Sequence, residues 1–329
     1  MLRSTIFIIL ISITFLFSGC ATPRIILFGD DSIPLKEYTL QGADKGKVLL
    51  IPVEGTISDE TKREFLNSKP SMIQEIVSQL SKAEKDPAVR AVVLKIDSPG
   101  GSVTASDVLY HEILTFKERT RKKIVAAMMN VAASGGYYIA LPADFILAHP
   151  TTVTGSVGVL FLQPNVTGLM EKIGVEVDVS KSGRNKDIGS PFRPSTAEEK
   201  EIIQGLIEKL GQRFLGLVAR HRKLNQINLS DVGTARLYLA DEAQRLGLVD
   251  KIGYLGEAIT EAKKLGGLSP AAKVVVYRRT DFPDDNLYNS RITSRSGSGP
   301  TLIDIDLPVS MKNLRTGFYY LWAPGLNNQ

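Results

Sequence analysis

The chain turns from a strand into a helix at Val131-Ala132-Ala133-Ser134-Gly135-Gly136-Tyr137-Tyr138. The apolar run 124–129 before it is typical of a buried strand, and residues 137–140 after it have helical character. Ser134 is therefore expected at a helix N-terminus, where unpaired backbone N–H groups and the helix dipole favour negative charge. This position suits a nucleophile, although a serine before two glycines is also a common helix N-cap.

Strands and helices alternate on both sides of this turn. The runs typical of strands are 47–53, 89–96, 123–129, 145–148, 175–179 and 273–277, and those with helical periodicity are 70–85, 106–117, 166–173, 196–225, 240–246 and 253–265. Apolar, β-branched strands that alternate with helices favour parallel βαβ units buried on both faces. The sequence therefore predicts an α/β fold.

A second glycine-rich turn, Asp97-Ser98-Pro99-Gly100-Gly101, directly follows the strand at 89–96. Glycine lacks a Cβ, so the backbone N–H groups of such a turn can approach a ligand closely; a plain tight turn is the alternative. Parallel units place the carboxyl ends of neighbouring strands at one edge of the sheet. We therefore expect this turn beside the Ser134 turn, where the two together supply a nucleophile and an oxyanion hole.

A serine nucleophile needs a base, and His111, His149 and His221 are scattered in unpromising contexts. The polar loop 181–192 carries Lys181 and Lys186. A lysine can act as a base when burial lowers its pKa, because desolvation disfavours the ammonium form. For each of these lysines a solvated surface charge is the alternative.

Composition excludes several classes of function. The 329 residues are 43% hydrophobic and 23% charged, which is ordinary for a globular protein. The net charge of +5 comes from interspersed charges and gives little support for a nucleic-acid partner. One cysteine and three scattered histidines make no convincing zinc site, so we expect neither a metal nor a cofactor.

The ends of the chain differ from its centre. Residues 1–20 are predicted to be a targeting segment, with Arg3, an apolar run at 6–17 and small residues before Cys20; the run is shorter than the about 20 residues that a membrane span needs. Residues 21–46 are interpreted as a tether and an edge segment. Residues 278–329 form a tail that is predicted to be partly disordered, and its apolar patch 318–322 docks back, contacts a partner or touches the membrane.

Taken in order, five motifs resemble the signal peptide peptidase A family, the Ser/Lys serine proteases of the ClpP/crotonase-like fold. They are residues 97–101, 132–140, 154–159, 181–187 and 243–250, within a resemblance that covers about 48–265. The resemblance implies repeated ββα units with stacked sheets and flanking helices, and it places the peptidase domain at 47–277.

The resemblance also implies a role for each matching residue. Ser134 matches the nucleophile and Lys186 the general base, with Lys181 as the rival base. Gly101 and Gly135 match the donors of the oxyanion-hole N–H groups. Ser156 matches a hydroxyl that orients the lysine, and a solvated turn serine is the alternative.

The family resemblance implies a serine endopeptidase that hydrolyses hydrophobic peptides, such as remnant signal peptides, through an acyl-enzyme. It implies a homo-oligomer in which serine and lysine come from one chain or from two, and the single motif set is similar to the short form of the family. Two other classes remain open: a crotonase-type acyl-CoA enzyme and a non-catalytic peptide-binding lipoprotein on the same scaffold.

Residues 17–20, Phe17-Ser18-Gly19-Cys20, resemble a bacterial lipoprotein signal, except that Phe17 stands where leucine is usual. That resemblance implies an exported lipoprotein that is anchored to a membrane through Cys20, with its catalytic domain outside the cytoplasm. A simple secretory signal and an uncleaved anchor are the alternatives.

Overall fold

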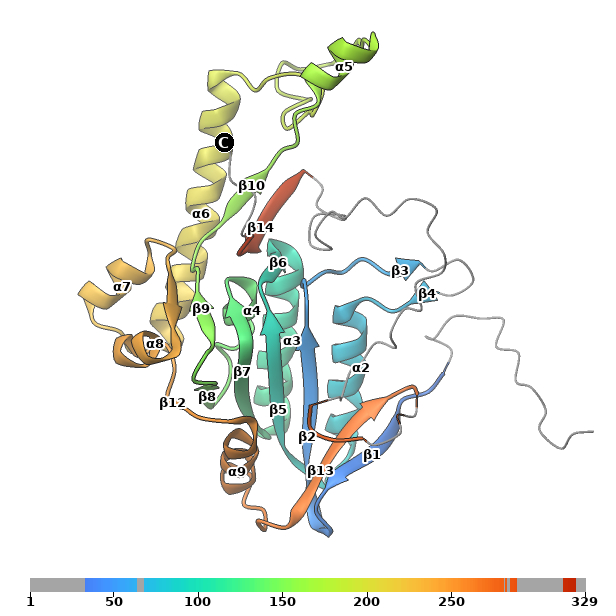
Figure 1. Cartoon of the computed structure of the whole chain (residues 1–329), viewed down its shortest axis with the longest axis vertical. Helices are drawn as coiled ribbons and strands as arrows, with labels where there is room; N and C mark the ends of the chain where they lie inside the picture. The colour runs from blue at the N-terminus through green and yellow to red at the C-terminus, as the bar shows by residue number, and fades with distance from the viewer. Residues whose placement is uncertain (1–32, 64–67, 281, 283–284, 289–315, 324–329) are drawn as a thin grey trace, which may run out of the picture.

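The structure is a computed structural model that describes residues 33–63, 68–280, 282, 285–288 and 316–323. The predicted targeting segment with Cys20 lies outside the described residues. Figure 1 shows a twisted sheet with helices against it and a long extension at one end. We call residues 163–206 the arm. Within the described ranges no helix is both long and apolar enough to cross a membrane.

The main sheet runs in the order β1-β13-β2-β5-β7-β8-β12, with β9 paired to the end of β7 and β11 paired to β9. Its strands are β1 (Lys36–Gln41), β2 (Asp44–Glu54), β5 (Val89–Ser98), β7 (Lys123–Ala133), β8 (Phe145–Ala148), β9 (Val153–Gly155), β11 (Leu237–Leu239), β12 (Lys251–Ile252) and β13 (Ala272–Arg278). The pairings are parallel except for those of β1 and β11, which are antiparallel.

A second, three-stranded sheet has the order β10-β14-β6, and β3 pairs with β4 in a short hairpin. These strands are β3 (Lys62–Arg63), β4 (Ser68–Lys69), β6 (Gly100–Ser102), β10 (Leu160–Leu162) and β14 (Gly317–Leu321). The helices are α2 (Met72–Lys85), α3 (Val103–Thr120), α4 (Gly135–Tyr138), α5 (Thr167–Ile173), α6 (Ala197–His221), α7 (Gln226–Val232), α8 (Ala240–Leu246) and α9 (Leu255–Leu265).

Both faces of the main sheet are buried, which explains the nearly continuous apolar runs in its strands. In β5, Val92 and Leu94 face the larger core, which α2, α3 and α4 cover, whereas Ala91 and Val93 face the smaller core under α9. Side chains of a strand alternate between its two faces, so each apolar strand contributes to both cores. The predicted α/β architecture of the ClpP/crotonase-like type is confirmed.

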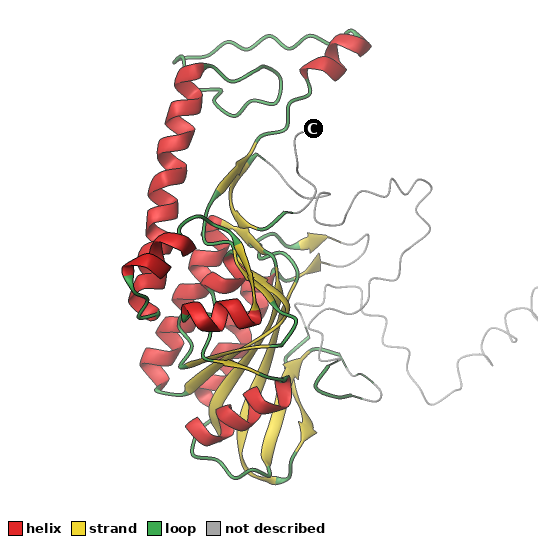
Figure 2. Ribbon diagram, turned by 60° about the vertical axis from the view of Figure 1, so that its left-hand side comes forward, coloured by secondary structure: helices red, strands yellow, loops and turns green. Residues whose placement is uncertain are grey.

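The long helix α6 begins at the predicted capping box. The Thr196 side chain accepts a hydrogen bond from the Glu199 N–H, and the Glu199 carboxylate accepts one from the Thr196 N–H. Phe214 and Val218 near the other end of α6 are fully buried in the larger core. Figure 2 shows α6 running from the body of the molecule to the outer end of the arm.

One expectation from the sequence is wrong, and one open choice is decided. The strand predicted at 175–179 is wrong for a single chain: these residues form no strand, and Val175, Val177 and Val179 are 49%, 43% and 46% exposed. Their alternation is that of a strand, but this chain offers them no sheet edge. For the apolar patch 318–322 three alternatives were open, and the structure docks it back as β14, between β6 and β10.

Candidate active site

Ser134 has the geometry of a strained and buried nucleophile. Its backbone is in a left-handed region, with φ 51° and ψ −116°, and the residue is 1% exposed. It is the N-cap of α4, but its side chain makes no capping hydrogen bond, and its Oγ finds no hydrogen-bond partner within the described residues. Strained backbone and unpaired buried polar groups concentrate at functional sites. Simple capping therefore does not account for Ser134.

The two glycine-rich turns lie side by side, as the sequence predicted. Ser98 pairs with Ala132 where β5 and β7 end. Gly100 has φ 102°, and a Cβ built on it would lie 2.7 Å from the Gly135 nitrogen. A Cβ on Gly135 would lie 2.5 Å from the Ser106 Oγ. Only glycine fits where the two turns touch.

Strand β14 crosses the site next to these turns. Tyr320 is opposite Gly101, and the Trp322 N–H donates to the Pro99 carbonyl at 2.9 Å. Hydrogen-bonded pairs alternate along an antiparallel ladder, so Gly101 and Tyr320 form the next such pair. The Tyr320 carbonyl oxygen lies 3.0 Å from the position that a Cβ on Gly135 would occupy. An extended segment thus places a backbone carbonyl between the two turns.

Two aromatic side chains that the sequence analysis did not connect with Tyr320 pack against it. Its ring stacks on Tyr138 at a centroid distance of 4.9 Å and packs at 4.9 Å against Phe214. The Tyr320 hydroxyl donates to the Leu210 carbonyl at 3.1 Å, and burial raises the pKa of Tyr320 to about 12. No local pattern joins residues 138, 214 and 320, because three distant elements bring them together.

Ser156 lies next to the nucleophile turn. The Ser134 N–H donates to the Gly155 carbonyl at 2.8 Å, and Ala133 pairs with Gly155. Ser156 itself has φ 52° and is half-buried, and its N–H donates to the Arg236 carbonyl at 2.9 Å. The backbone therefore brings Ser156 to the site, and its role as the hydroxyl that orients the base stays a prediction.

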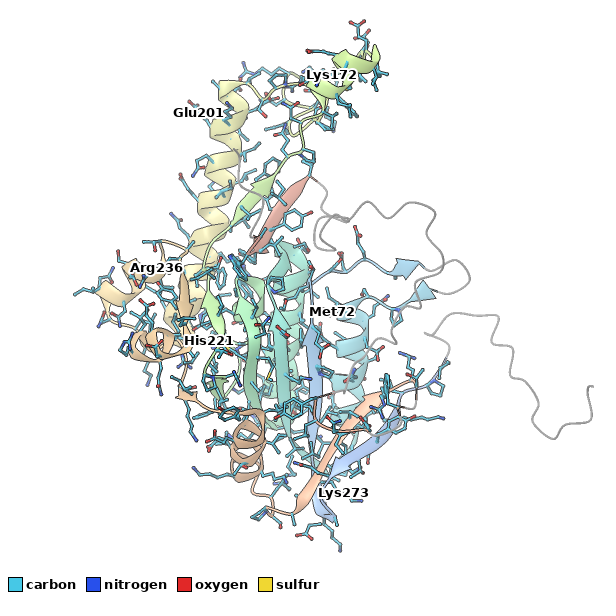
Figure 3. The ribbon with its side chains drawn as sticks, in the orientation of Figure 1. Met72, Lys172, Glu201, His221, Arg236 and Lys273 are labelled. Atoms are coloured by element: carbon cyan, nitrogen blue, oxygen red, sulfur yellow. The ribbon has the colours of Figure 1, made fainter. Side chains whose placement is uncertain are left out.

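A single chain does not bring the two candidate lysines to Ser134. Lys186 is exposed, whereas Ser134 is buried without a hydrogen-bond partner for its Oγ in the described ranges. Lys181 donates to the Asp187 carboxylate at 2.7 Å. The segment between α5 and α6, which carries both lysines, lies in the arm beyond β10 and β14, and α4 lies below these strands in Figure 1. Figure 3 labels Lys172 at the outer end of the arm and Glu201 on α6.

No group of histidine, cysteine, aspartate or glutamate side chains that could hold a metal ion occurs in the part of the chain that the structure describes. The chemistry that the site offers is that of a buried hydroxyl at a helix start beside backbone N–H groups. Together with the parallel sheet, this defines a protein of the ClpP/crotonase-like class.

Comparison with known proteins identifies the family. Residues 117–269 match the model of peptidase family S49, and residues 65–152 match that of the Clp proteases. A protein of Enterococcus faecium that is named as a signal peptide peptidase of the SppA type is 34% identical over 253 residues, which are 77% of this chain and 73% of that protein. The chain belongs to peptidase family S49, the signal peptide peptidase A family, and it is a peptidase.

Two further relatives are longer than this chain. Protease 4 of Haemophilus influenzae is 34% identical over 274 residues, which are 79% of this chain and 44% of that protein. The chloroplastic serine protease SPPA of Arabidopsis thaliana is 30% identical over 275 residues, 83% of this chain and 39% of that protein. The chain thus spans less than half of these two proteins.

Proposed function

We propose that this protein is a serine endopeptidase that cleaves hydrophobic peptides, such as remnant signal peptides, with Ser134 as the nucleophile and Lys186 as the general base. The observation that carries the proposal is the Ser134 hydroxyl: it is buried, lies on a left-handed backbone and has no partner in the described part of the chain. Such a hydroxyl stays available for a base that reaches it from elsewhere.

The proposed reaction passes through an acyl-enzyme. Neutral Lys186 takes the proton from the Ser134 Oγ as this oxygen attacks the peptide carbonyl carbon. Once a substrate strand has taken the place of β14 on β6, the N–H groups of Gly101, which otherwise pairs with Tyr320, and of Gly135 stabilise the oxyanion, and Ser156 orients the lysine. The C–N bond then breaks, and the lysine gives its proton to the leaving amine. Water hydrolyses the ester, with the lysine again accepting a proton, and restores the Ser134 hydroxyl.

The position of β14 supports an extended, hydrophobic peptide as the substrate. This segment adds to β6 as an antiparallel strand and buries Tyr320 completely against aromatic side chains. Strand addition gives main-chain affinity, and pockets for alternate side chains give specificity. A substrate strand that binds in the same way would present its scissile carbonyl to Ser134 and an apolar side chain to Tyr138.

We also propose that the dyad forms between two copies of the chain. Ser134 and Lys186 are not brought together within one chain, and the arm that carries Lys186 exposes apolar side chains. These include Leu169 and Ile173, which are 60% and 62% exposed, and the three valines of the unpaired segment 175–179. A homo-oligomer would cover this surface and complete the site.

The proposed location of the protein in the cell depends on Cys20. With Cys20 lipidated, the chain would be an exported bacterial lipoprotein, held at a membrane with its catalytic domain outside the cytoplasm. Mass spectrometry of the mature protein tests this, because a diacylglycerol on Cys20 supports the anchor and an unmodified Cys20 rejects it.

The test of the proposed activity is hydrolysis of a fluorogenic peptide with aromatic and aliphatic residues by the full chain in detergent. Ser134→Ala and Lys186→Ala are each expected to lower kcat by about 10⁴-fold or more. A matched peptide with acidic residues at the same positions is expected to be a poor substrate. An active Ser134→Ala variant would reject the nucleophile.

Mixing the two inactive variants tests the shared site. Equal amounts of Ser134→Ala and Lys186→Ala, dissociated and reassembled together, are expected to regain about a quarter of the wild-type activity, because one site in four would combine an intact serine with an intact lysine. No recovery in a mixture that has reassembled would place both residues in the same chain.

A further inference from the structure

The loop that carries Lys186 is held by a single guanidinium. Arg193 donates from Nε to Asp187 Oδ2 at 2.8 Å and from Nη2 to Asp187 Oδ1 at 2.8 Å. The same guanidinium donates from Nη1 to Glu199 Oε2 at 2.9 Å and from Nη2 to Glu199 Oε1. Arg193 thus joins two carboxylates, each through two hydrogen bonds, which is the strongest form of carboxylate recognition.

Of these two carboxylates, Asp187 belongs to the turn that carries Lys186. The Lys186 N–H donates to the Gly183 carbonyl at 3.0 Å, and the Ser190 N–H donates to the Asp187 carbonyl at 3.0 Å. Lys181 adds a third side-chain donor to Asp187. Asp187 is therefore tied at both its side chain and its backbone, and the residue before it is the proposed base.

The other carboxylate, Glu199, belongs to the rigid part of the arm. It lies in the first turn of α6, belongs to the capping box with Thr196 and is only 1% exposed. Burying a carboxylate is costly unless it is paired and hydrogen-bonded. Arg193 meets this requirement and lowers the pKa of Glu199 to about 2. The ion pair of Arg193 with Glu199 therefore fixes the Lys186 loop to the first turn of α6.

A nearby ion pair on the same loop shows what an ordinary surface contact looks like here. Arg184 contacts Glu198 at 2.7 Å, with side chains that are 80% and 41% exposed. Exposed pairs of this kind contribute little, because water and salt screen them. The cluster of Asp187, Arg193 and Glu199 differs in burial and in its two bidentate contacts, although it lies only a few residues away.

We propose that Arg193 is a positioning residue for Lys186: by binding Asp187 and Glu199 together, it fixes the Lys186 turn to the start of α6 before a second copy of the chain docks. This rests on the proposed function, in which Lys186 is the base. A lysine held in place in advance loses less conformational freedom when the site assembles, and misplacing a catalytic group by about 1 Å can cost about 10²-fold in rate. Lys181 is already bound to Asp187, which favours Lys186 as the base.

Arg193→Gln tests the proposal in the full chain with the fluorogenic peptide. We expect kcat to fall by about 10²-fold while KM changes by less than about threefold, because substrate binding does not use Arg193. The acid limb of the pH–rate profile is expected to move to higher pH, because a cation is removed beside a carboxylate near the base. The matched control is Arg184→Gln, which removes a cation from the same loop and is expected to leave kcat within about twofold of wild type.

A second variant separates positioning from folding of the arm. Asp187→Asn keeps the contact of Arg193 with Glu199 at the start of α6, and it weakens the contacts of Arg193 and Lys181 with the Lys186 turn. We expect the same loss of kcat as for Arg193→Gln, but an acid limb that moves to lower pH, because a carboxylate near the base is removed. The double variant should have a kcat no lower than that of either single variant. Arg193→Lys is not expected to restore kcat, because an ammonium cannot bind both carboxylates bidentately.

The outcomes distinguish this proposal from the proposed function. If Ser134→Ala and Lys186→Ala are inactive but Arg193→Gln and Asp187→Asn keep the wild-type kcat and pH profile, Arg193 does not position the base. If both variants lose kcat in proportion to a loss of thermal stability, and the pH–rate profile does not shift, the role of Arg193 is structural. That outcome also overturns the proposal. If Lys186→Ala itself is active, the proposed function fails first.

Discussion

The turn of Ser134 and the loop of Lys186 are built in opposite ways. The Ser134 turn is buried between two strand ends. Backbone atoms leave no room for a Cβ at Gly100 or Gly101, and a Cβ on Gly135 would lie 2.5 Å from the Ser106 Oγ. The Lys186 loop is exposed on the arm, where hydrogen bonds between charged side chains hold it. A Cβ built on Gly183, three residues before Lys186, meets no atom within 4 Å.

The two residues of the proposed dyad are therefore held in position by different forces. Close packing determines the position of the nucleophile, so small changes in side-chain volume there are expected to lower stability and activity. Charge pairing determines the position of the base, so pH and salt act there first. A site divided in this way is completed when a half held by close packing meets a half held by charge pairing, which suits a dyad that forms between chains.

The largest effect is expected from one methyl group added to the packed half, at Gly101. Gly101→Ala would bring a Cβ within 1.9 Å of the Ile57 carbonyl oxygen, which is backbone and cannot turn aside. We expect peptide hydrolysis to fall by at least about 10²-fold and the free energy of unfolding to drop by about 3 kcal/mol. Assays of hydrolysis and denaturant unfolding measure both.

The matched change in the other half is Gly183→Ala, which meets open space and is expected to shift stability by less than about 0.5 kcal/mol. If the two substitutions lower the free energy of unfolding equally, the Ser134 turn is not packed more tightly than the Lys186 loop.

The next effect, of similar size but on stability alone, is expected at Tyr320, and it tests whether β14 belongs to the packed half. Its ring is fully buried against Tyr138 and Phe214. Tyr320→Ala should lower the free energy of unfolding by about 3 kcal/mol, because it leaves a cavity among aromatic rings. Thermal unfolding measures this, with Tyr288→Ala as the control because that side chain is 63% exposed. Equal stability of the two variants would mean that β14 is dispensable to the core.

The smallest expected effect is the response of the arm to acid. Arg193 lowers the pKa of Glu199 from 4.5 to about 2 and that of Asp187 below its usual range. A carboxylate with a depressed folded-state pKa contributes stability above its unfolded pKa, and this contribution is lost as the pH falls through the folded value. Between pH 4.5 and 2 the start of α6 should therefore loosen.

Hydrogen exchange of backbone amides, corrected for its intrinsic pH dependence, measures this loosening. Amides in the first turns of α6 should lose protection over that interval while those of β5 and β7 keep theirs. Glu199→Gln should remove most of the difference between the two regions. An arm whose protection does not change with pH would show that charge pairing does not hold it.

Sequence patterns predicted most of the elements that position the site. The apolar strands and the amphipathic helices α2, α6 and α9 follow from local periodicity, and the capping box at Thr196 marks the start of α6 correctly. The strand–turn–helix at Ser134 and the Pro-Gly-Gly turn were also found in the sequence. Their adjacency followed from the rule that parallel strands end at one edge.

The one wrong strand and the choices that stayed open lie where a segment needs a partner that the sequence does not identify. Residues 175–179 alternate like a strand but pair with nothing in the chain that the structure describes. The patch 318–322 had three possible contacts, and only the fold selected the edge of β6. The sequence did not single out Arg193, because an arginine in a polar loop cannot be distinguished by its pattern from an ordinary solvated charge.

The sequence alone determined the candidate residues for the chemistry and most of the segments that become strands and helices, because glycine-rich turns, apolar periodicity and helix caps are local properties. Only the tertiary structure decided that β14 lies beside Gly101, that Ser134 is buried without a partner in the described residues and that Lys186 stays on an exposed arm. These relations join residues far apart in the chain, and packing of the whole molecule fixes them, not any local preference.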